Sequence, residues 1–393
     1  MLNFEYYTPT KVVFGKNAEA QVGRLVKEQN CKKVLVHYGS GSAKKSGLLD
    51  RIFDSLRAEG IDFVSLGGVV PNPRLSKVYE GIDLCKKENV DFILAVGGGS
   101  VIDSAKAIGY GLANDCDVWE RYSQKATPKG AAPVGAVLTI AAAGSEMSNS
   151  SVITNEEGWL KRSCNTDYIR CKFAVMNPEL TYTLPKYQTA SGCTDILMHT
   201  MERFFSLEKH TELTDRLCEG LLRTVMRNAK ILMTDPQNYD ARAEIMWAGS
   251  LSHNGLTGCG TGGGDWAPHQ LEHELGGMFD VAHGAGLAAV WGSWARYVYR
   301  TDVARFVQFA VNVMGVTNDF RDPEAVALAG IEAMENFYRE IEMPTSIHEM
   351  GIDVTDDQIK ELAYKCSFED TRTIGHFQVL DRSDMEKIYT MAR

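Results

Sequence analysis

The sequence predicts two domains of different class: an α/β domain at residues 1–185 and an all-α domain at residues 186–393. Three observations support this prediction. The chain has 393 residues, which is more than one hydrophobic core normally serves. The first half alternates short β-branched runs with helical patterns, whereas long helical patterns alone follow residue 185. The boundary is expected at the LPKY segment, residues 184–187.

The first half contains strand and helix patterns that follow one another closely. The strand candidates are KKVLVHYG (32–39), IDFVSL (61–66), DFILAVGGGS (91–100), VGAVLTI (134–140), SSVITN (150–155) and CKFAVMN (171–177). The helix candidates between them are SGLLDRIFDSLRAEG (46–60), RLSKVYEGIDLCKKE (74–88) and SVIDSAKAIGYGLA (100–113). Repeated units of this length predict a parallel sheet covered by helices on both faces.

The second half shows apolar residues at helical spacing over long stretches. The clearest helix candidates span residues 190–207, 214–233 and 324–341. Because no strand pattern interrupts them, an all-helical domain follows.

Composition limits the classes of partner. The net charge of −10 and the pI near 5.5 disfavour nucleic acid and anionic membrane surfaces. Nine scattered cysteines without a CxxC pair are typical of reduced thiols. The N-terminus does not resemble a secretion signal, and no apolar stretch reaches bilayer-spanning length. We therefore expect a cytoplasmic protein that does not enter a membrane.

Two glycine-rich loops follow strand candidates. In AVGGGSVIDSAKAI (95–108), three glycines and a serine stand where a strand passes into a helix, a place suited to a pyrophosphate. The spacing is neither GxGxxG nor a P-loop, so a turn required only by packing remains an alternative. We interpret the first half as a Rossmann-like dinucleotide-binding domain.

The earlier loop, HYGSGSAKKSG (37–47), bears on which dinucleotide binds. It has no acidic residue to pair with a ribose 2′-hydroxyl, whereas its serines and lysines could accept a 2′-phosphate: Ser40, Ser42, Lys44 and Lys45. This chemistry favours NADP over NAD. A solvated turn with ordinary surface lysines is the alternative.

Three of the nine histidines fall within PHQLEHELGGMFDVAHGAG (268–286). His269 and His273 are four residues apart and share a helix face, and His283 follows beyond a glycine pair. Asp195 and His199 show the same spacing upstream. One carboxylate with imidazoles suits Fe(II), Zn(II) or a related divalent ion. Spacing alone leaves open whether His269 or His273 is a ligand, and whether these are simply buried core residues.

A zinc protease is excluded at one position. The HExxH motif would need a second histidine where this chain has Gly277.

Several motifs together resemble the iron-containing alcohol dehydrogenase family. In chain order they are GGGSVIDSAK, TIAAAGSEMS, NPELTYTLP, ASGCTDILMHTMERF and GDWAPHQLEHELGGMFDVAHGAGLA. The likeness extends over essentially the whole chain and is greatest to the branch of butanol dehydrogenases and broad-specificity aldehyde reductases. One departure is TIAAAG at 139–144, where the family more often has TIPATG.

The resemblance implies roles for particular residues. It implies metal ligation by Asp195, His199, His269 and His283, with His273 free near the nicotinamide to transfer a proton. It implies nucleotide contacts at Gly39, Ser40, Ser42, Gly97, Gly98, Gly99, Ser100, Asp103, Lys106 and Thr139. Relatives that prefer NAD carry an acidic residue at the position of Gly39, which agrees with the expectation of NADP.

The resemblance also implies an activity. We expect a metal-dependent, NAD(P)H-linked enzyme that interconverts short to medium aliphatic aldehydes and primary alcohols, with NADPH favoured, and that forms a homodimer or larger homo-oligomer. An NAD-dependent polyol dehydrogenase is the nearest alternative. A metal-dependent hydrolase and a noncatalytic nucleotide or metal sensor are alternatives from other classes.

Overall fold

The computed structural model describes residues 1–393, which form two compact units. One unit is Thr8–Leu184, and the other is Pro185–Arg393 together with Met1–Tyr7. The backbone N–H of Leu2 donates to the carbonyl of Gly260 within this second unit. The first seven residues thus group with the helical part of the chain, and the expected domain limits of 1–185 and 186–393 remain a prediction.

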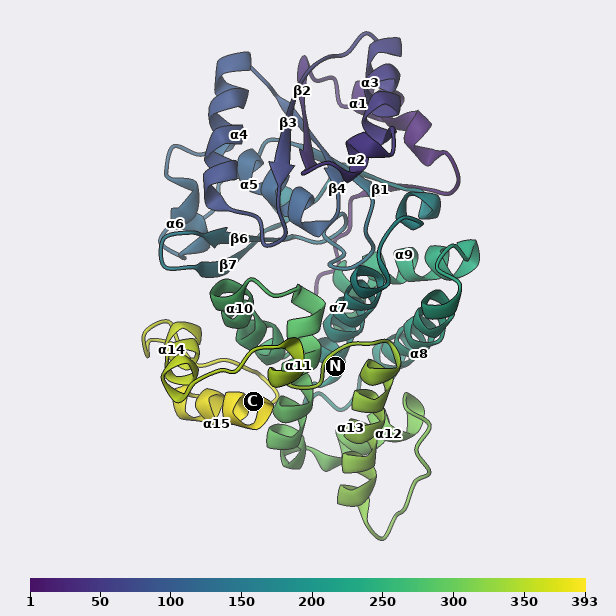
Figure 1. Ribbon diagram of the computed structural model, residues 1–393, viewed down its shortest axis with the longest axis vertical. Helices are drawn as coiled ribbons and strands as arrows, with labels where there is room; N and C mark the ends of the chain where they lie inside the picture. Colours follow the sequence, from purple (N-terminus) through teal and green to yellow (C-terminus); the bar gives the residue numbers. More distant parts are fainter. The chain divides into compact units, whose positions relative to one another are not determined.

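The unit Thr8–Leu184 contains a six-stranded sheet in the order β1-β8-β5-β4-β2-β3, and all its pairings are parallel. This confirms the predicted α/β class (Figure 1). The strands are β1 (Lys11–Phe14), β2 (Lys33–Gly39), β3 (Asp62–Val69), β4 (Phe92–Gly97), β5 (Val134–Leu138) and β8 (Phe173–Met176).

Helices pack against both faces of this sheet. They are α1 (Val22–Lys27), α2 (Ser42–Lys45), α3 (Leu48–Ala58), α4 (Leu75–Glu88), α5 (Gly99–Ala113) and α6 (Val118–Tyr122). Val34 and Val36 of β2 share one buried core with Leu25 of α1 and Ile52 of α3. Leu35, between the two valines, is equally buried and points to the opposite face. Strands buried on both faces give the continuous apolar runs seen in the sequence.

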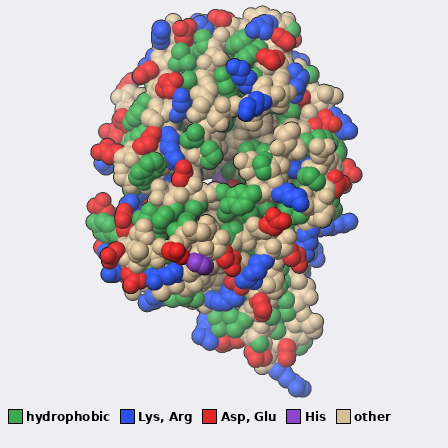
Figure 2. Space-filling model, viewed as in Figure 1, with side chains coloured by type: hydrophobic (Ala, Val, Ile, Leu, Met, Phe, Trp, Pro, Cys, Tyr) green, Lys and Arg blue, Asp and Glu red, His purple; other side chains and the backbone are tan.

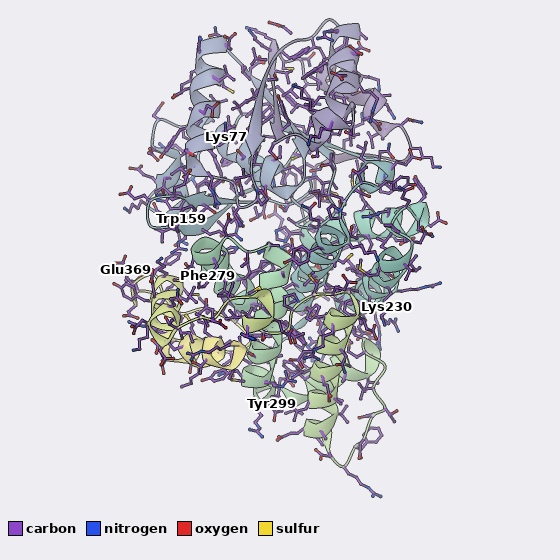
Figure 3. All side chains as sticks on the ribbon, in the orientation of Figure 1. Lys77, Trp159, Lys230, Phe279, Tyr299 and Glu369 are labelled. Atoms are coloured by element: carbon purple, nitrogen blue, oxygen red, sulfur yellow. The ribbon has the colours of Figure 1, made fainter.

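The segment SSVITN has a different place from the other strand candidates. It forms β6 (Ser150–Asn155), which pairs with β7 (Leu160–Asn165) in a separate antiparallel hairpin. Trp159, labelled in Figure 3, lies directly before β7 with φ 52°, and the guanidinium of Arg74 lies 4.9 Å from its ring centroid.

The order of the strands creates a switch point beside β2. The chain runs from β2 to β3 on one side, and then crosses to β4 on the other side of β2. The loops after β2 and β4 therefore diverge at the carboxyl edge of the sheet. Open α/β sheets bind ligands in the crevice formed at such a point.

The unit Pro185–Arg393 is built from helices, as predicted for the second half. They are α7 (Lys186–Phe204), α8 (Glu212–Thr234), α9 (Tyr239–His253), α10 (Ala267–Phe279), α11 (His283–Val298), α12 (Val303–Asn312), α13 (Pro323–Glu340), α14 (Asp356–Cys366) and α15 (Arg382–Ala392). The long helices α7, α8 and α13 correspond to the three ranges read from the sequence. From Gly192 to Phe204, every residue of α7 is buried.

Short 3-10 turns join several of these elements. They are η1 (Ala18–Gln21), η2 (Asp167–Ile169), η3 (Pro178–Thr181), η4 (Leu256–Gly258), η5 (Tyr299–Thr301) and η6 (His348–Met350).

Two features agree with the composition. All nine cysteines are free thiols, and none of the helices is long and apolar enough to cross a bilayer. The face seen in Figure 2 carries acidic and basic side chains interspersed, without a broad patch of one sign.

Candidate functional site

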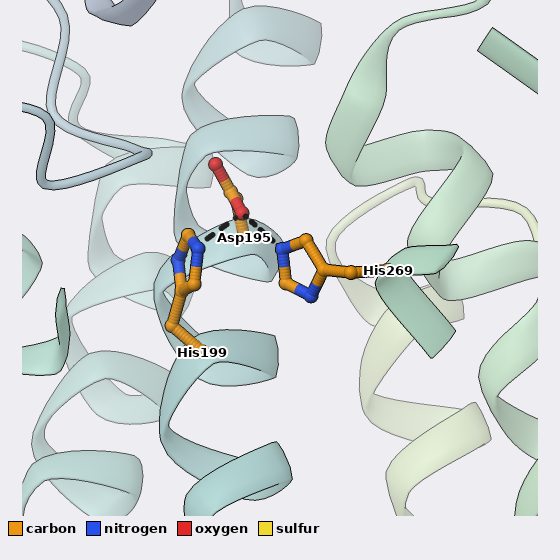
Figure 4. Close-up of side chains that lie close together, drawn as sticks. All are labelled: Asp195, His199 and His269. Carbon is orange, nitrogen blue, oxygen red and sulfur yellow. Dashed lines mark ion pairs between the residues drawn. The ribbon is translucent and has the colours of Figure 1, made fainter. Parts of the chain in front are cut away.

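Helix α7 carries two of the predicted metal ligands. Asp195 and His199 are one turn apart, and their side chains are 4% and 5% exposed. The Nδ1 atom of His199 lies 3.3 Å from Oδ1 of Asp195 (Figure 4). Burial of ionisable groups is costly unless they are paired or hold a cation, so this pair in the interior of α7 marks a candidate site.

Helices α10 and α11 bring two more imidazoles to the same oxygen. The Nε2 atoms of His269, on α10, and His283, the first residue of α11, lie 3.5 Å and 3.6 Å from Oδ1 of Asp195. The ring centroids of His199 and His269 are 4.5 Å apart, and those of His269 and His283 are 5.2 Å apart. The structure thus brings all four predicted ligands together around one carboxylate oxygen.

In three of these side chains, the atom that faces the other ligands has no hydrogen-bond partner. These atoms are Oδ1 of Asp195, Nδ1 of His199 and Nε2 of His269. Buried polar atoms are almost always satisfied, so three such atoms within 4.8 Å of one another need an explanation. A carboxylate oxygen and imidazole nitrogens are the donors that Fe(II) and Zn(II) take, and the residues therefore fit a divalent cation.

His273 lies beside this cluster but not in it. Its ring centroid is 6.3 Å from that of His269 and 5.9 Å from that of His283. Its nearby potential donors are Glu272 and His283, whereas His269 groups with Asp195 and His199. The distances favour His269 over His273 as a ligand, the choice that helical spacing had left open.

Sequence reasoning missed three residues that surround the cluster. Buried Glu202 accepts a hydrogen bond from Nδ1 of His269, and buried Glu272 accepts one from Nδ1 of His283. The ring of His253, at the end of α9, lies 4.0 Å from that of His199 between centroids. A signal for the two glutamates was present in the sequence, because the spacing His-x-x-Glu occurs in both HTME and HQLE.

Arg203 connects His253 to α7. Its guanidinium donates to Nδ1 of His253 and to the backbone carbonyls of His199 and Ser252. It also lies 4.5 Å from the ring centroid of Trp266. The back of the His199 ring is therefore packed by aromatic rings and a fixed cation.

The two neighbouring histidines have opposite pKa shifts. Burial holds the pKa of His199 well below its ordinary value, and the adjacent imidazoles and Arg203 lower it further. Burial also lowers the pKa of His269, but the carboxylates of Glu202 and Asp195 outweigh it and raise the pKa to about 9. Opposed shifts within one buried cluster are typical of functional sites.

The predicted nucleotide residues gather at the carboxyl edge of the sheet in the other unit. Gly39 ends β2, Ser40 follows it directly, and Gly97 ends the adjacent strand β4. The backbone N–H of Thr139, after β5, donates to the carbonyl of Gly97. Ser42 begins α2, and Gly99 and Ser100 begin α5 after the N-cap Gly98. The two loops thus flank the switch point beside β2.

Packing also accounts for part of the glycine run. A Cβ added to Gly97 would lie 2.5 Å from Val101, and one added to Gly98 or Gly99 would lie 3.0 Å from Ile140 or Ala143. The segment TIAAAG (139–144), which differs from the family's usual TIPATG, therefore packs directly on the glycine turn. The structural requirement for glycine and a role in phosphate binding are compatible, because both need a turn without side chains.

Asp103 and Lys106, for which we expect nucleotide contacts, make hydrogen bonds within the protein. The Lys106 ammonium is fully buried and donates to the carbonyl oxygens of Ser145, Ser148 and Ser150. Asp103 accepts hydrogen bonds from the Ser145 hydroxyl and the Val152 N–H. The three N–H bonds of the Lys106 ammonium are thus matched by three carbonyl oxygens. The side chains of Lys106 and Asp103 both hold the segment between β5 and β6.

The comparisons with known proteins cover both units. Residues 9–178 match the family described as "Iron-containing alcohol dehydrogenase". Residues 189–393 match the "Fe-containing alcohol dehydrogenase family, C-terminal". The chain belongs to the iron-containing alcohol dehydrogenase family.

Relatives in this family are similar over their whole length. "Probable NADH-dependent butanol dehydrogenase 1" of Bacillus subtilis (strain 168) is 39% identical over 99% of both chains. "NADPH-dependent aldehyde reductase YqhD" of Escherichia coli (strain K12) is 34% identical over 100% of both. The crystal structure of NADH-dependent butanol dehydrogenase A from Thermotoga maritima superposes with a TM-score of 0.96 at 38% identity, covering 100% of this chain and 99% of that one.

Family membership establishes the class of reaction. The chain is an oxidoreductase, an NAD(P)H-linked alcohol dehydrogenase or aldehyde reductase that acts on small molecules. The predicted family, fold and enzyme class are confirmed.

Proposed function

We propose that this enzyme interconverts short to medium aliphatic aldehydes and primary alcohols, and that it favours NADPH. The observation that carries the proposal is the convergence of Asp195, His199, His269 and His283 on one buried point. Relatives named butanol dehydrogenase and aldehyde reductase support the substrate class. An NAD-dependent polyol dehydrogenase of the same family is the alternative, since a 1,3-propanediol dehydrogenase of Citrobacter freundii is 29% identical.

We assign these four side chains as ligands of one divalent cation, Fe(II) or Zn(II). A cation held there supplies Lewis acidity that polarises the substrate oxygen. Asp195 contributes the only anionic donor of the set, and the three imidazoles bind as neutral bases through the nitrogens that face it. Burial of Asp195, His199 and His269 keeps water away from the reacting oxygen.

We assign His273 to proton transfer. It is 7% exposed, and its ring centroid lies 6.3 Å from that of His269 and 5.9 Å from that of His283, outside the cluster around Asp195. Imidazole exchanges protons near neutral pH, so a histidine placed beside the reacting oxygen can protonate the product alkoxide. The hydride itself is transferred by the nicotinamide.

His273→Ala tests this assignment against metal ligation. We expect turnover to fall by about 10²-fold or more while bound metal stays near the wild-type level. His269→Ala is the comparison and should release the metal. If His273→Ala loses the metal and His269→Ala keeps it, the two roles are reversed.

We propose that NADPH binds at the loops after β2 and β4. Support comes from the absence of acidic residues between Tyr38 and Ser46, and from the exposed Lys44 and Lys45 at the end of α2. The names of relatives are divided, because four of those similar to this chain are called NADH-dependent and YqhD is called NADPH-dependent. Asp103 and Lys106 would act here by holding the adjoining segment. By family resemblance we also propose a cytoplasmic homodimer or larger homo-oligomer.

The decisive experiment is a steady-state assay on protein of defined metal content. Initial rates with NADPH and NADH are compared over an aldehyde series from acetaldehyde to octanal, with glycerol and 1,3-propanediol in the oxidative direction. We expect the highest kcat/KM with NADPH and a linear aldehyde of about four carbons. Higher kcat/KM with NAD and a polyol would establish the alternative.

A further inference from the structure

The spacing His-x-x-Glu occurs in both helices that carry the cation site. On α7 it joins His199 to Glu202, and on α10 it joins His269 to Glu272. Each glutamate accepts a hydrogen bond from a histidine outside its own motif. Glu202 accepts from His269 on α10, and Glu272 accepts from His283 on α11. Each helix therefore supplies one imidazole to the site and one carboxylate to the imidazole of the next element.

Each carboxylate accepts a hydrogen bond from the Nδ1 atom of a histidine ring. His269 and His283 each donate from Nδ1, so the neutral ring carries its proton there and Nε2 is the unprotonated nitrogen. Those two Nε2 atoms are the ones that lie 3.5 Å and 3.6 Å from Oδ1 of Asp195. We propose that Glu202 and Glu272 are positioning residues that fix the tautomer and direction of His269 and His283 so that both present Nε2 to a divalent cation. This inference rests on the proposed cation site.

Burial makes the arrangement stiff. The Glu202 side chain is 1% exposed and the Glu272 side chain is 0% exposed. Gly286 on α11 leaves the room that Glu272 needs, because a Cβ there would lie 2.9 Å from its Cγ. Carboxylates held in this way raise the basicity of a ligating imidazole and limit its rotation.

Glu202 also contacts the backbone of His269 at the start of α10. Its other oxygen accepts the backbone N–H of His269 at 3.0 Å. The N-cap of α10 is Trp266, whose side chain offers no cap, and Asp265 accepts the N–H of Ala267 instead. Glu202 and Asp265 thus satisfy the first turn of α10 from outside the helix. The backbone and ring of His269 are set by the same carboxylate.

The charges agree with a divalent ion. Asp195, Glu202 and Glu272 carry three buried negative charges, and Arg203 carries one buried positive charge. Buried carboxylates need compensating positive charge, and a divalent cation held at the site would supply it. A second cation at Glu272, His273 and His283 would compete for the carboxylate that holds His283.

The experiment uses the full-length enzyme stripped of metal and titrated with Co(II) or Zn(II) against a chelating dye. The variants are Glu202→Gln and Glu272→Gln, which keep shape but remove the charge. The matched control is Glu219→Gln on α8, whose carboxylate is similarly buried, at 2% exposed, but pairs with Arg216. We expect each site variant to raise the Kd of the cation by about 10- to 100-fold and to shift the visible Co(II) bands, with no change in the control.

The outcomes separate this inference from the proposed function. If both site variants bind the cation with the wild-type Kd and give the wild-type Co(II) spectrum, the inference is wrong, whereas the proposed cation site is unaffected. Failure of the wild-type enzyme to bind Co(II) or Zn(II) overturns the proposed function itself. Binding of two ions per chain overturns the role of Glu272. If Glu202→Gln fails to fold because α10 loses its cap, Glu272→Gln decides the question alone, with far-UV circular dichroism as the check on folding.

Discussion

At the scale of single residues, the chemistry depends on side chains whose neighbours come from other parts of the chain. Asp195 and His199 could be recognised because their spacing places them on one helix face. The choice between His269 and His273 could not be made in this way, because both lie on one face of α10 and only the structure shows that His269 groups with Asp195. Glu202 and Glu272 were missed because each supports a histidine on a different element.

Gly39 is the residue on which the cofactor preference can be tested most directly. A Cβ at this position would be 3.5 Å from the carbonyl of Val69 and 3.8 Å from Val101, which is ordinary contact. Gly39→Asp should therefore fold normally and place a carboxylate at the end of β2, where it accepts from a ribose 2′-hydroxyl and repels a 2′-phosphate.

We expect Gly39→Asp to lower kcat/KM for NADPH by about 10-fold or more and to spare or improve that for NADH, because one misplaced charge costs about 1–3 kcal/mol. Paired initial-rate measurements on one aldehyde check this. Gly41→Ala, where an added Cβ has no neighbour within 4 Å, is the control in the same loop. An unchanged ratio of the two cofactors would remove Gly39 from the nucleotide site.

At the scale of elements, local sequence patterns identified the long helices and the central strands, and the structure has them. The apolar runs of β2 and β4 are unmistakable because both faces are buried. The order β1-β8-β5-β4-β2-β3 could not be read, since pairing of parallel strands is not a local property. The polar hairpin strand β7 was missed because LKRSCN lacks both alternation and β-branched residues.

The packing of α11 on α7 fixes where His283 lies. Gly284, the second residue of α11, has no room for a side chain, because a Cβ would lie 2.0 Å from the carbonyl oxygen of Ser191 on α7. Gly284→Ala must push the two helices apart and move His283 away from Asp195. We expect it to cost about 1–3 kcal/mol in the free energy of unfolding and to weaken cation binding.

Gly220→Ala on α8 is the control in the same unit, at a glycine where an added side chain has room. Nothing lies within 4 Å of an added Cβ there, so the change should stabilise the helix by up to about 1 kcal/mol. Urea unfolding of the metal-free variants, together with the Kd of Co(II), checks both. Wild-type stability and Kd in Gly284→Ala would show that the α7–α11 contact does not set the site.

At the scale of the whole molecule, the acidic net charge disfavours nucleic acid as a partner but does not identify the activity. We propose that the activity depends on the histidine and carboxylate cluster of the helical unit and on the carboxyl edge of the sheet in the α/β unit. The two units also contain buried ionisable groups of different kinds. In the α/β unit, His37 on β2 is 0% exposed, as is Lys106 on α5. Its Nδ1 faces the carbonyl of Leu66 at 3.0 Å and its Nε2 faces the Ser104 hydroxyl at 2.9 Å. It joins β2, β3 and α5 as a neutral ring that donates to the carbonyl.

His37 should make the α/β unit sensitive to acid. Burial lowers the pKa of His37 from 6.5 to about 4. Because the folded-state pKa lies below the unfolded value, its contribution to stability is fully present above pH 6.5 and is lost as the pH falls toward 4. The shift corresponds to about 3 kcal/mol over that window. We expect His37→Gln to be less stable than wild type at pH 7 and to lose this part of the acid dependence.

Hydrogen-exchange protection of β2 and β4 peptides, corrected for the intrinsic effect of pH on exchange, measures this pH dependence of stability in the full chain. His348→Gln, at an exposed histidine paired with Asp353, should keep the wild-type dependence. An identical acid response in His37→Gln and wild type would mean that the sheet tolerates the buried imidazolium.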